Sequence, residues 1–256
     1  MTKTTSTKTL VKTLDILLSF DSICTHQKTS EIARKLNLNI STVSRHLTDL
    51  VSYGFLEQDI ESGYYYLGSK VIGLAGVALN SSALYKIAYQ EVYQLSKKMN
   101  LYASMSILKD TNIMHLFDVF TEDTFNLLIP IGYERALASC AMGRIILANL
   151  PDSLACSIVS KTKVAKLTPY SINTASEIME QIFTAKRTSY SILVDEIKIG
   201  TSSIATAIYD KNAKVIGAIS VSAETNKLND KYKDEVVNNL LIAANNISAK
   251  LGYFPR

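Results

Sequence analysis

Hydrophobic residues recur every three or four positions along five stretches of the first hundred residues, which is the period of an amphipathic helix. We expect helices at residues 10–20, 29–36, 41–50, 69–80 and 83–99. After Gly54 the pattern changes to the two-residue alternation of strands over two short runs, 55–58 and 64–67, with Gly63 in the turn between them. This order predicts a helix-turn-helix followed by a β-hairpin wing.

The remaining residues alternate between strand patterns and helix patterns. Strands are expected at 102–108, 113–119, 125–131, 189–194, 202–209 and 215–222, and helices at 142–150, 153–160, 176–186 and 229–251. Strand runs that are joined by short polar turns predict a mostly antiparallel sheet with helices packed on it. The expected fold class is therefore α+β, in two domains that meet near residues 80–83.

The helix expected at 41–50 has two faces of different chemistry. Apolar residues share the buried face, and the outer face carries small hydroxyls and one guanidinium, namely Thr42, Ser44, Arg45 and Thr48. In the major groove an arginine can pair with guanine, and hydroxyls can contact base edges or phosphates. This face predicts a DNA-reading helix. The alternative is an ordinary helical subdomain in which Arg45 is a solvated charge.

The composition is that of an ordinary folded protein, with 47% hydrophobic and 20% charged residues among 256. The net charge of +4 does not by itself indicate a nucleic acid partner, but its distribution does. Before residue 47 only three acidic residues accompany seven basic ones, which are Lys3, Lys8, Lys12, Lys28, Arg34, Lys35 and Arg45. Such an excess around the candidate helices is what phosphate binding requires.

Several kinds of chemistry are not expected. Cys24, Cys140 and Cys156 are far apart, and the three histidines form no helical ligand pair, so we expect no metal site, disulfide or cofactor. A reducing cytoplasm fits this cysteine usage. We expect neither a signal peptide nor a membrane span, because the first ten residues have no apolar core and no run approaches about 18 apolar residues. A hydrolase with Cys140 as nucleophile and His115 as base is an alternative. We expect no catalysis, because Cys140 lies among small residues at a helix start, where cysteine packs as a small hydrophobe.

The ordered motifs resemble the IclR family of bacterial transcriptional regulators over nearly the whole chain. The motifs are TSEIARKLNL (29–38), STVSRHL (41–47), YGFLE (53–57), GYYYLG (63–68), ASCAMGR (138–144), the Ser189-Tyr190 strand start, GTSSIATAI (200–208) and GAISVS (217–222). The resemblance implies a winged helix-turn-helix at 1–68, a connecting helix at 69–82, and a GAF-like effector-binding and oligomerisation domain at 83–256. It also implies a repressor that binds double-stranded operator DNA as a homodimer or homotetramer, without a membrane partner, under the control of a small organic-acid-like effector.

The resemblance also assigns the DNA-binding residues. They are Ser41, Thr42, Ser44 and Arg45 on the recognition helix. We add Thr29 and Ser30, at the start of the helix before the turn, as candidate DNA contacts. Thr29, Ser30 and Ser41 are in addition the expected helix caps, because a hydroxyl at that position can accept from a first-turn amide. The wing tip at 61–63 is acidic, which argues against deep insertion into the minor groove.

For the effector, the resemblance places the backbone amides of Ala141, Met142 and Gly143 at a helix start where a carboxylate can bind. It adds Ser202 and Ser203 on a strand, and Leu193 where many members carry an acidic contact. Apolar Leu193, Met142 and Phe125 favour a less polar ligand, with plain core packing as the alternative. A regulator that has lost its ligand and binds DNA constitutively remains the alternative function.

Overall fold

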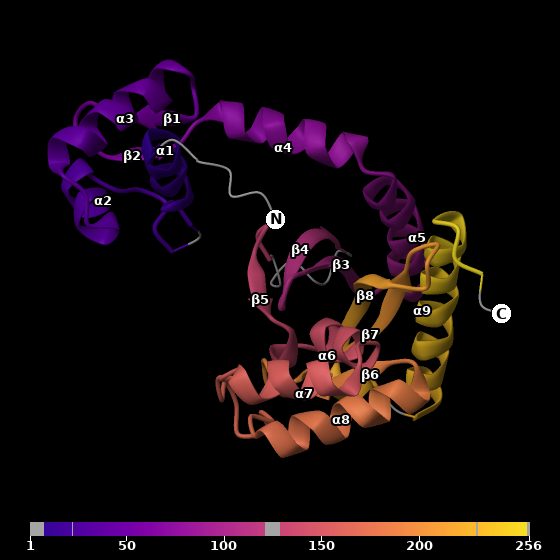
Figure 1. The fold of residues 1–256 in the computed structure, drawn as a ribbon. Coiled ribbons are helices and arrows are strands. Elements are labelled where there is room, and N and C mark those ends of the chain that lie inside the picture. The colour runs from indigo at the N-terminus through magenta and orange to yellow at the C-terminus, as the bar shows by residue number, and fades with distance from the viewer. Residues whose placement is uncertain (1–7, 22, 121–128, 229, 255–256) are drawn as a thin grey trace. The chain divides into compact units, whose positions relative to one another are not determined.

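The computed structural model describes residues 8–21, 23–120, 129–228 and 230–254 (Figure 1). The chain divides into two compact units, Met1–Ser81 and Ser82–Arg256. The elements of the first unit are α1 (Lys8–Leu18), α2 (Thr29–Leu36), α3 (Ile40–Ser52), β1 (Leu56–Gln58), β2 (Tyr65–Leu67) and α4 (Ser69–Ser81).

The core of the first unit lies where α1, α2, α3 and the hairpin meet. Ile16, Ile32, Val43, Leu47 and Leu56 have no exposed surface. These residues come from all three helices and from β1. The apolar residues that recur at helical spacing in the sequence therefore face one shared core. Strands β1 and β2 pair in antiparallel register, and residue 27 adds an isolated bridge to β2. The unit is a helix-turn-helix with a wing, as the hydrophobic pattern predicts.

The caps of α2 and α3 differ from the prediction. Helix α3 begins at Ile40, and its N-cap is Asn39 rather than Ser41. Helix α2 is preceded by Lys28, whose backbone amide donates to Glu31 Oε2 at 2.7 Å. Because Thr29 and Ser41 already lie inside the first turns, their hydroxyls are not needed as caps. The turn between the helices is closed by an asparagine in the left-handed conformation.

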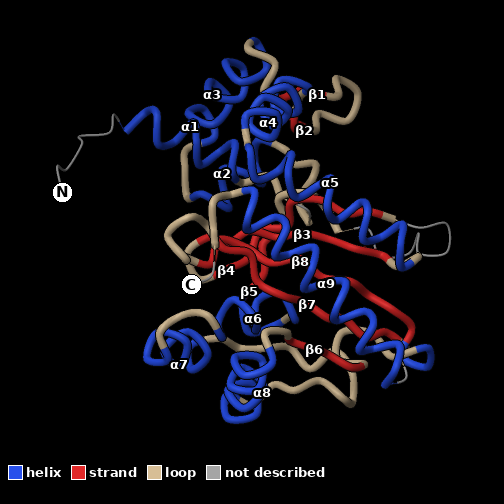
Figure 2. Tube along the Cα trace, turned by 90° about the vertical axis from the view of Figure 1, so that its right-hand side faces the viewer, coloured by secondary structure: helices blue, strands red, loops and turns tan. Residues whose placement is uncertain are grey.

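The second unit is a six-stranded antiparallel sheet covered by helices on both faces (Figure 2). Its strand order is β5-β4-β3-β8-β7-β6. The strands are β3 (Tyr102–Lys109), β4 (Asn112–Val119), β5 (Glu134–Ala136), β6 (Ser191–Val194), β7 (Thr201–Tyr209) and β8 (Val215–Glu224). Helices α5 (Ala83–Met99) and α9 (Asp230–Lys250) pack on one face, and the other face carries α6 (Ala141–Ala148), α7 (Asp152–Lys161) and α8 (Ala175–Thr188).

One expected strand is misplaced. Of the run 125–131, residues 125–128 lie outside the described residues, and 129–131 are not in a strand. The edge strand is instead β5, which pairs with β4 through the register Ile113↔Arg135. Its sequence, Glu-Arg-Ala, has no apolar alternation, because an edge strand of three residues buries little.

The described residues contain neither a single membrane-spanning helix nor a cluster of metal ligands. No single helix there has the length and hydropathy to cross a bilayer, and only α4 and α5 taken together, across the break between them, pass that test. No group of three or more histidine, cysteine or acidic side chains lies close enough to hold a metal ion within the part of the chain that the structure describes.

Candidate functional site

Helix α3 presents two faces, as its sequence pattern requires. Val43, Leu47 and Leu50 face the core, whereas Ser41, Ser44 and Arg45 are exposed and Thr42 is partly exposed. The Thr48 hydroxyl donates to the Ser44 carbonyl at 3.0 Å, so its proton is used within the helix. The guanidinium of Arg45 forms no ion pair with any described residue. Arg45 is therefore the one long donor on this face, beside short hydroxyls.

The start of α2 supplies a second set of donors. The amides of Thr29 and Ser30 lie in the first turn and donate to no group among the described residues. Helix starts of this kind attract phosphate oxygens because the free amides and the helix dipole both favour negative charge. The Lys28 ammonium, 4.8 Å from the centre of the Tyr64 ring, lies next to this turn in sequence and adds positive charge.

The tip of the wing is acidic and ordered by its own turn. Asp59 Oδ1 accepts from the amides of Glu61 at 2.9 Å and Ser62 at 3.2 Å. Hydrogen bonds from Ser62, through its side chain and its amide, and from the Glu61 amide lower the pKa of Asp59. Two carboxylates at the tip would repel phosphates, so shallow placement of the wing over the minor groove stays a prediction.

The second unit contains a cavity of about 290 Å³ on the α6 face of the sheet. Its floor is formed by β3, β7 and β8, and its other walls by the start of α6 and the loop that follows β6. The lining residues are Tyr102, Ser104, Ile129, Arg135, Cys140, Ala141, Met142, Leu193, Glu196, Ile197, Lys198, Thr201, Ser203, Ser220 and Ser222.

The floor of the cavity consists of two rows of residues that run across the strands. One row follows the register Ser104↔Ser220, and the other follows Tyr102↔Ser222↔Ser203↔Leu193. The hydroxyls of Ser104 and Ser220 lie 2.9 Å apart, and those of Ser203 and Ser222 also lie 2.9 Å apart. A hydrophobic sheet face is thus replaced here by paired hydroxyls.

The start of α6 closes the cavity with its backbone. The amides of Ala141 and Met142 donate to no group among the described residues, whereas the amide of Gly143 donates to Cys140 Sγ at 3.4 Å. Gly143 is required by packing, because a Cβ there would lie 1.9 Å from the Leu137 carbonyl oxygen. Burial raises the pKa of the Cys140 thiol, despite opposing contributions that include Arg135.

Arg135 brings a cation to the same cavity. It lies on β5, and its guanidinium interacts with the Cys140 thiol and acts to lower the pKa of the Tyr102 phenol. The guanidinium carbon lies 5.4 Å from the centre of the Tyr133 ring, and no carboxylate of the described residues pairs with it. Sequence reasoning missed this residue, since β5 has no pattern that identifies a strand.

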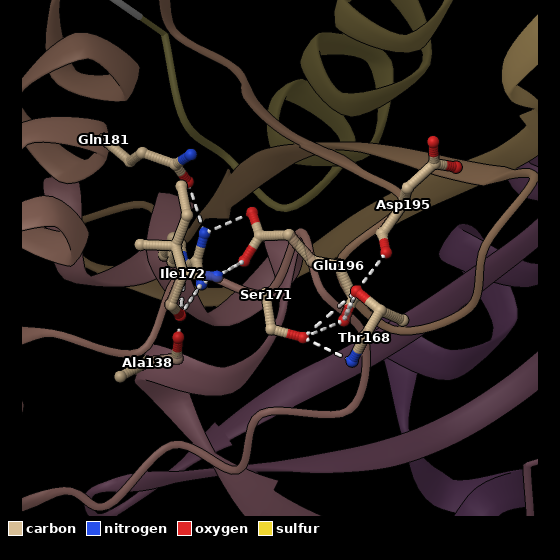
Figure 3. A network of polar contacts seen from close by, with 8 residues as sticks. Ala138, Thr168, Ser171, Ile172, Gln181, Asp195 and Glu196 are labelled. Atoms are coloured by element: carbon tan, nitrogen blue, oxygen red, sulfur yellow. Dashed lines mark hydrogen bonds and ion pairs between the residues drawn. The ribbon is translucent and has the colours of Figure 1, made fainter.

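A second arginine, Arg144, has a different role, and Figure 3 draws the polar network that includes its partners Glu196 and Gln181. Arg144 is fully buried, and its two terminal nitrogens each lie 2.8 Å from an oxygen of Glu196. It also donates to the Ala138 carbonyl at 3.0 Å and to the side chain of Gln181. This pair fixes the loop after β6, one wall of the cavity, onto α6. The positive charge of Arg144 is therefore neutralised inside the protein.

The same loop has further anchors. The Thr168 hydroxyl donates to the Asp195 carbonyl at 2.7 Å, and the Ser171 hydroxyl donates to the Glu196 carbonyl at 2.7 Å (Figure 3). Asp195 Oδ1 in turn accepts from Thr225 and from the Gly200 amide. The wall that carries Ile197 and Lys198 is thus held at both ends by polar contacts.

The structure brings together four of the six predicted effector residues. Ala141, Met142, Leu193 and Ser203 line the cavity. Gly143 does not, because its amide and its Cα position serve the packing of α6. Ser202 does not either: its side chain points to the other side of β7 and lies 3.0 Å from the Thr225 hydroxyl. Phe125 lies outside the described residues.

Comparison with known proteins covers both units. The family model described as "Bacterial transcriptional regulator IclR C-terminal" matches residues 76–249, and the IclR helix-turn-helix domain matches residues 9–59. A regulator from Haemophilus influenzae is 30% identical over 95% of this chain and 91% of its own length. The KdgR regulator of Dickeya chrysanthemi is 26% identical, with 88% of this chain and 73% of its own length covered.

Solved structures show the same fold. An IclR regulator from Alicyclobacillus acidocaldarius has a TM-score of 0.84 at 22% identity, with 96% of this chain and all of that chain covered. An IclR homologue from Microbacterium hydrocarbonoxydans, solved with 4-hydroxybenzoate, has a TM-score of 0.81 at 21% identity and covers 95% of this chain and 99% of its own. The predicted α+β fold class is confirmed.

Proposed function

Because the chain belongs to the IclR family of bacterial transcriptional regulators, we propose that it represses its target by binding operator DNA through α3. A small carboxylate that enters the cavity of the second unit would raise or lower the affinity for that operator. The observation that carries the effector half is Arg135, a cation in a cavity without a carboxylate partner among the described residues. Repression is the proposed sign because the AllR relatives of Escherichia coli are named repressors.

The DNA half rests on the exposed face of α3 and the start of α2. Arg45 would pair with a guanine edge, while the hydroxyls of Ser41, Thr42 and Ser44 contact bases or phosphates. The free amides of Thr29 and Ser30 would hold a phosphate. In this proposal α3 supplies the base contacts that give specificity, and the start of α2 adds a phosphate contact that positions the protein on the DNA.

The effector half rests on the donors of the cavity. A carboxylate at the start of α6 would accept from the amides of Ala141 and Met142 and pair with Arg135. The apolar side chains of Met142 and Leu193 would contact the body of the ligand. The 4-hydroxybenzoate of the Microbacterium homologue is a ligand of this chemical kind, which supports a small carboxylate here.

A second copy of the chain is part of the proposal. In the described part of α4 every residue is at least partly exposed, including Ile72, Leu74 and Val77, and on α1 Leu14 and Leu18 are exposed as well. Apolar helix faces of this kind are covered in a stable oligomer. Two helix-turn-helix units also give the affinity and specificity that one small helix lacks.

The experiment is a selection of bound genomic fragments at near-physiological salt, followed by anisotropy titrations on the selected operator and on random DNA. Wild type should select one partly palindromic sequence, and Arg45→Ala should lose specific affinity. The control is Arg187→Ala, which removes an exposed arginine of α8 whose guanidinium donates to the Thr184 hydroxyl on the same helix. Selection of no sequence, or equal losses by both variants, contradicts the proposal.

The effector half is tested on the same operator complex. A panel of small carboxylates should change operator affinity in wild type and in Arg187→Ala, and Arg135→Ala should lose that response while keeping operator affinity. If no carboxylate changes either operator binding or thermal stability, the regulator is a constitutive one. Catalysis by Cys140 has no support in the geometry, because its thiol pKa is raised and His115 forms no hydrogen bond with it.

A further inference from the structure

We propose that the free edge of β6 is a docking site for an extended segment of a partner protein, in which basic and apolar side chains alternate. Such a segment would pair with β6 and add a strand to the six-stranded sheet of the second unit. The contacts involve neither the DNA-reading face of α3 nor the interior of the effector cavity, so this interaction is independent of the proposed function.

β6 is the last strand of its sheet, and its outer backbone groups have no partner. Asp195, directly after β6, donates its amide to the Thr201 carbonyl at 3.1 Å. In an antiparallel ladder the residues that bond to the neighbouring strand alternate, so the residues of β6 that bond to β7 are those at odd positions. The amides and carbonyls of Ile192 and Val194 therefore point to the free edge, and they bond to no group among the described residues.

The sequence of β6 contains nothing that discourages a further strand. Edge strands that stay unpaired are usually protected by charges, by proline or by being very short. The opposite edge of the sheet follows this rule, because β5 has only three residues and two of them, Glu134 and Arg135, are charged. The sequence of β6 is Ser-Ile-Leu-Val, without a charge or a proline. Its free backbone groups are thus open to pairing.

A groove of about 410 Å³ lies beside this edge, between β6 and α8, with Ser191 and Ile192 on the strand side. The two elements are neighbours in Figure 1. The helix side is polar, and its hydroxyl groups come from Thr184 and Thr188, which are one turn apart on α8. The space next to the free backbone groups is therefore large enough for side chains of an added strand.

The charges of the groove are all negative. Glu177 and Glu180 are the only charged residues in its lining, and both are exposed. The Glu177 carboxylate accepts from the Thr174 hydroxyl at the cap of α8. The Glu180 carboxylate forms no ion pair with any described residue. A segment that enters this groove is therefore favoured if it carries lysine or arginine.

The two faces of an added strand would have different neighbours. Leu193 lies on the α6 face of the sheet, so Ile192 and Val194 lie on the opposite face, where the Val194 side chain is 45% exposed. A residue paired opposite Ile192 or Val194 would share that face and cover its apolar surface. The residues between would point to the α8 side, towards Glu180. This alternation specifies apolar side chains on one face and basic side chains on the other.

The test is fluorescence anisotropy of labelled peptides on the full chain at near-physiological salt. The probe is Lys-Val-Lys-Val-Lys-Val-Lys, and in the comparison peptide every lysine is replaced by glutamate. Wild type should bind the lysine peptide at least about 5-fold more tightly, the factor expected from exposed ion pairs.

Two methylated forms of the lysine peptide test the backbone pairing. In the antiparallel arrangement the valines lie opposite Ile192 and Val194, so N-methylation of two neighbouring valines blocks two hydrogen bonds to β6. Binding should weaken by about 5- to 150-fold, as expected for two ordinary hydrogen bonds. N-methylation of two neighbouring lysines, whose amides face away from β6, is the matched control and should have little effect.

Three variants of the chain locate the site. Ile192→Pro removes an amide at the free edge without removing a bond to β7, and it should abolish binding of the lysine peptide. Glu180→Lys should reverse the preference between the lysine and glutamate peptides. The control is Glu235→Lys, which makes the same change of charge at an exposed position of α9 outside the groove and should keep the preference.

The outcomes decide among the occupants of this edge. Absence of binding by the lysine peptide at millimolar concentration, equal effects of the two methylated forms, or an unchanged preference in Glu180→Lys would each refute the docking site. If sedimentation shows that Ile192→Pro lowers the oligomeric state while no peptide binds, the edge is an interface between copies of this chain and the proposal fails. Any of these failures leaves the operator and effector proposals standing. The Glu180→Lys result keeps the test decisive if Ile192→Pro does not fold.

Discussion

Replacing Arg144 with methionine should strongly destabilise the second unit. The change keeps an unbranched chain of similar length but leaves the Glu196 carboxylate, 6% exposed at its side chain, without its cation. It also removes the donors to the Ala138 carbonyl and to Gln181. Removing one partner of a buried pair costs about 3–5 kcal/mol, because the remaining charge stays desolvated. For a unit of this size, that corresponds to a fall in Tm of roughly 6–20 °C.

The assay is denaturation followed by far-UV circular dichroism and tyrosine fluorescence, since the chain has 14 tyrosines and no tryptophan. The matched control is Lys186→Met, which breaks an exposed ion pair with Asp152 whose side chains are 49% and 60% exposed. An exposed pair contributes about 0–1 kcal/mol, so this variant should resemble wild type.

A double variant separates the burial of a charge from the loss of packing. Arg144→Met combined with Glu196→Leu removes both charges and should recover much of the stability lost by Arg144→Met, because replacing a whole buried pair by apolar groups is often neutral. A loss below about 1 kcal/mol for Arg144→Met, equal to that of Lys186→Met, refutes the assignment of a stabilising role to the buried pair.

Three further predictions concern other parts of the chain. Arg45→Ala should cost about 1–3 kcal/mol on the specific operator and little on random DNA, measured by anisotropy; equal losses would make Arg45 a phosphate contact. Gly143→Ala should destabilise the second unit, because its Cβ would lie 1.9 Å from the Leu137 carbonyl oxygen, and an unchanged Tm would contradict this packing. At neutral pH iodoacetamide should label exposed Cys156 well before Cys140, whose buried thiol has a raised pKa, and mass spectrometry of the labelled peptides tests the order.

The helices and most strands could be predicted because their periods of hydrophobicity reflect which face is buried. In α3, for example, Val43, Leu47 and Leu50 recur at helical spacing because all three face one core. The strand β5 could not be predicted, because its three residues form a short edge with no buried alternation. The cap at Asn39 was missed for a related reason: several adjacent polar residues fit a cap equally well, and only the backbone decides among them.

The candidate site was only partly predictable. Met142, Leu193 and Ser203 are brought to the cavity, but each was assigned from motifs rather than from contacts. The role of Arg144 could not be inferred from the sequence. Its true partner, Glu196, is 52 residues away along the chain, and no periodicity connects them. Pairing over such a separation is a property of the fold, so a motif can suggest a cation but cannot say whether its charge is already neutralised.

The serine floor illustrates why a binding surface can be hidden in an ordinary strand pattern. Strands β3, β7 and β8 place Ser104, Ser203, Ser220 and Ser222 on the α6 face, at positions where a buried sheet face carries apolar residues. Taken one strand at a time, each serine is a small interruption that core packing tolerates. Only the register across the sheet joins the interruptions into one polar surface beneath a cavity. Because burying unpaired hydroxyls is unfavourable, such a surface is stable where its hydroxyls pair with one another, as Ser104 does with Ser220 and Ser203 does with Ser222.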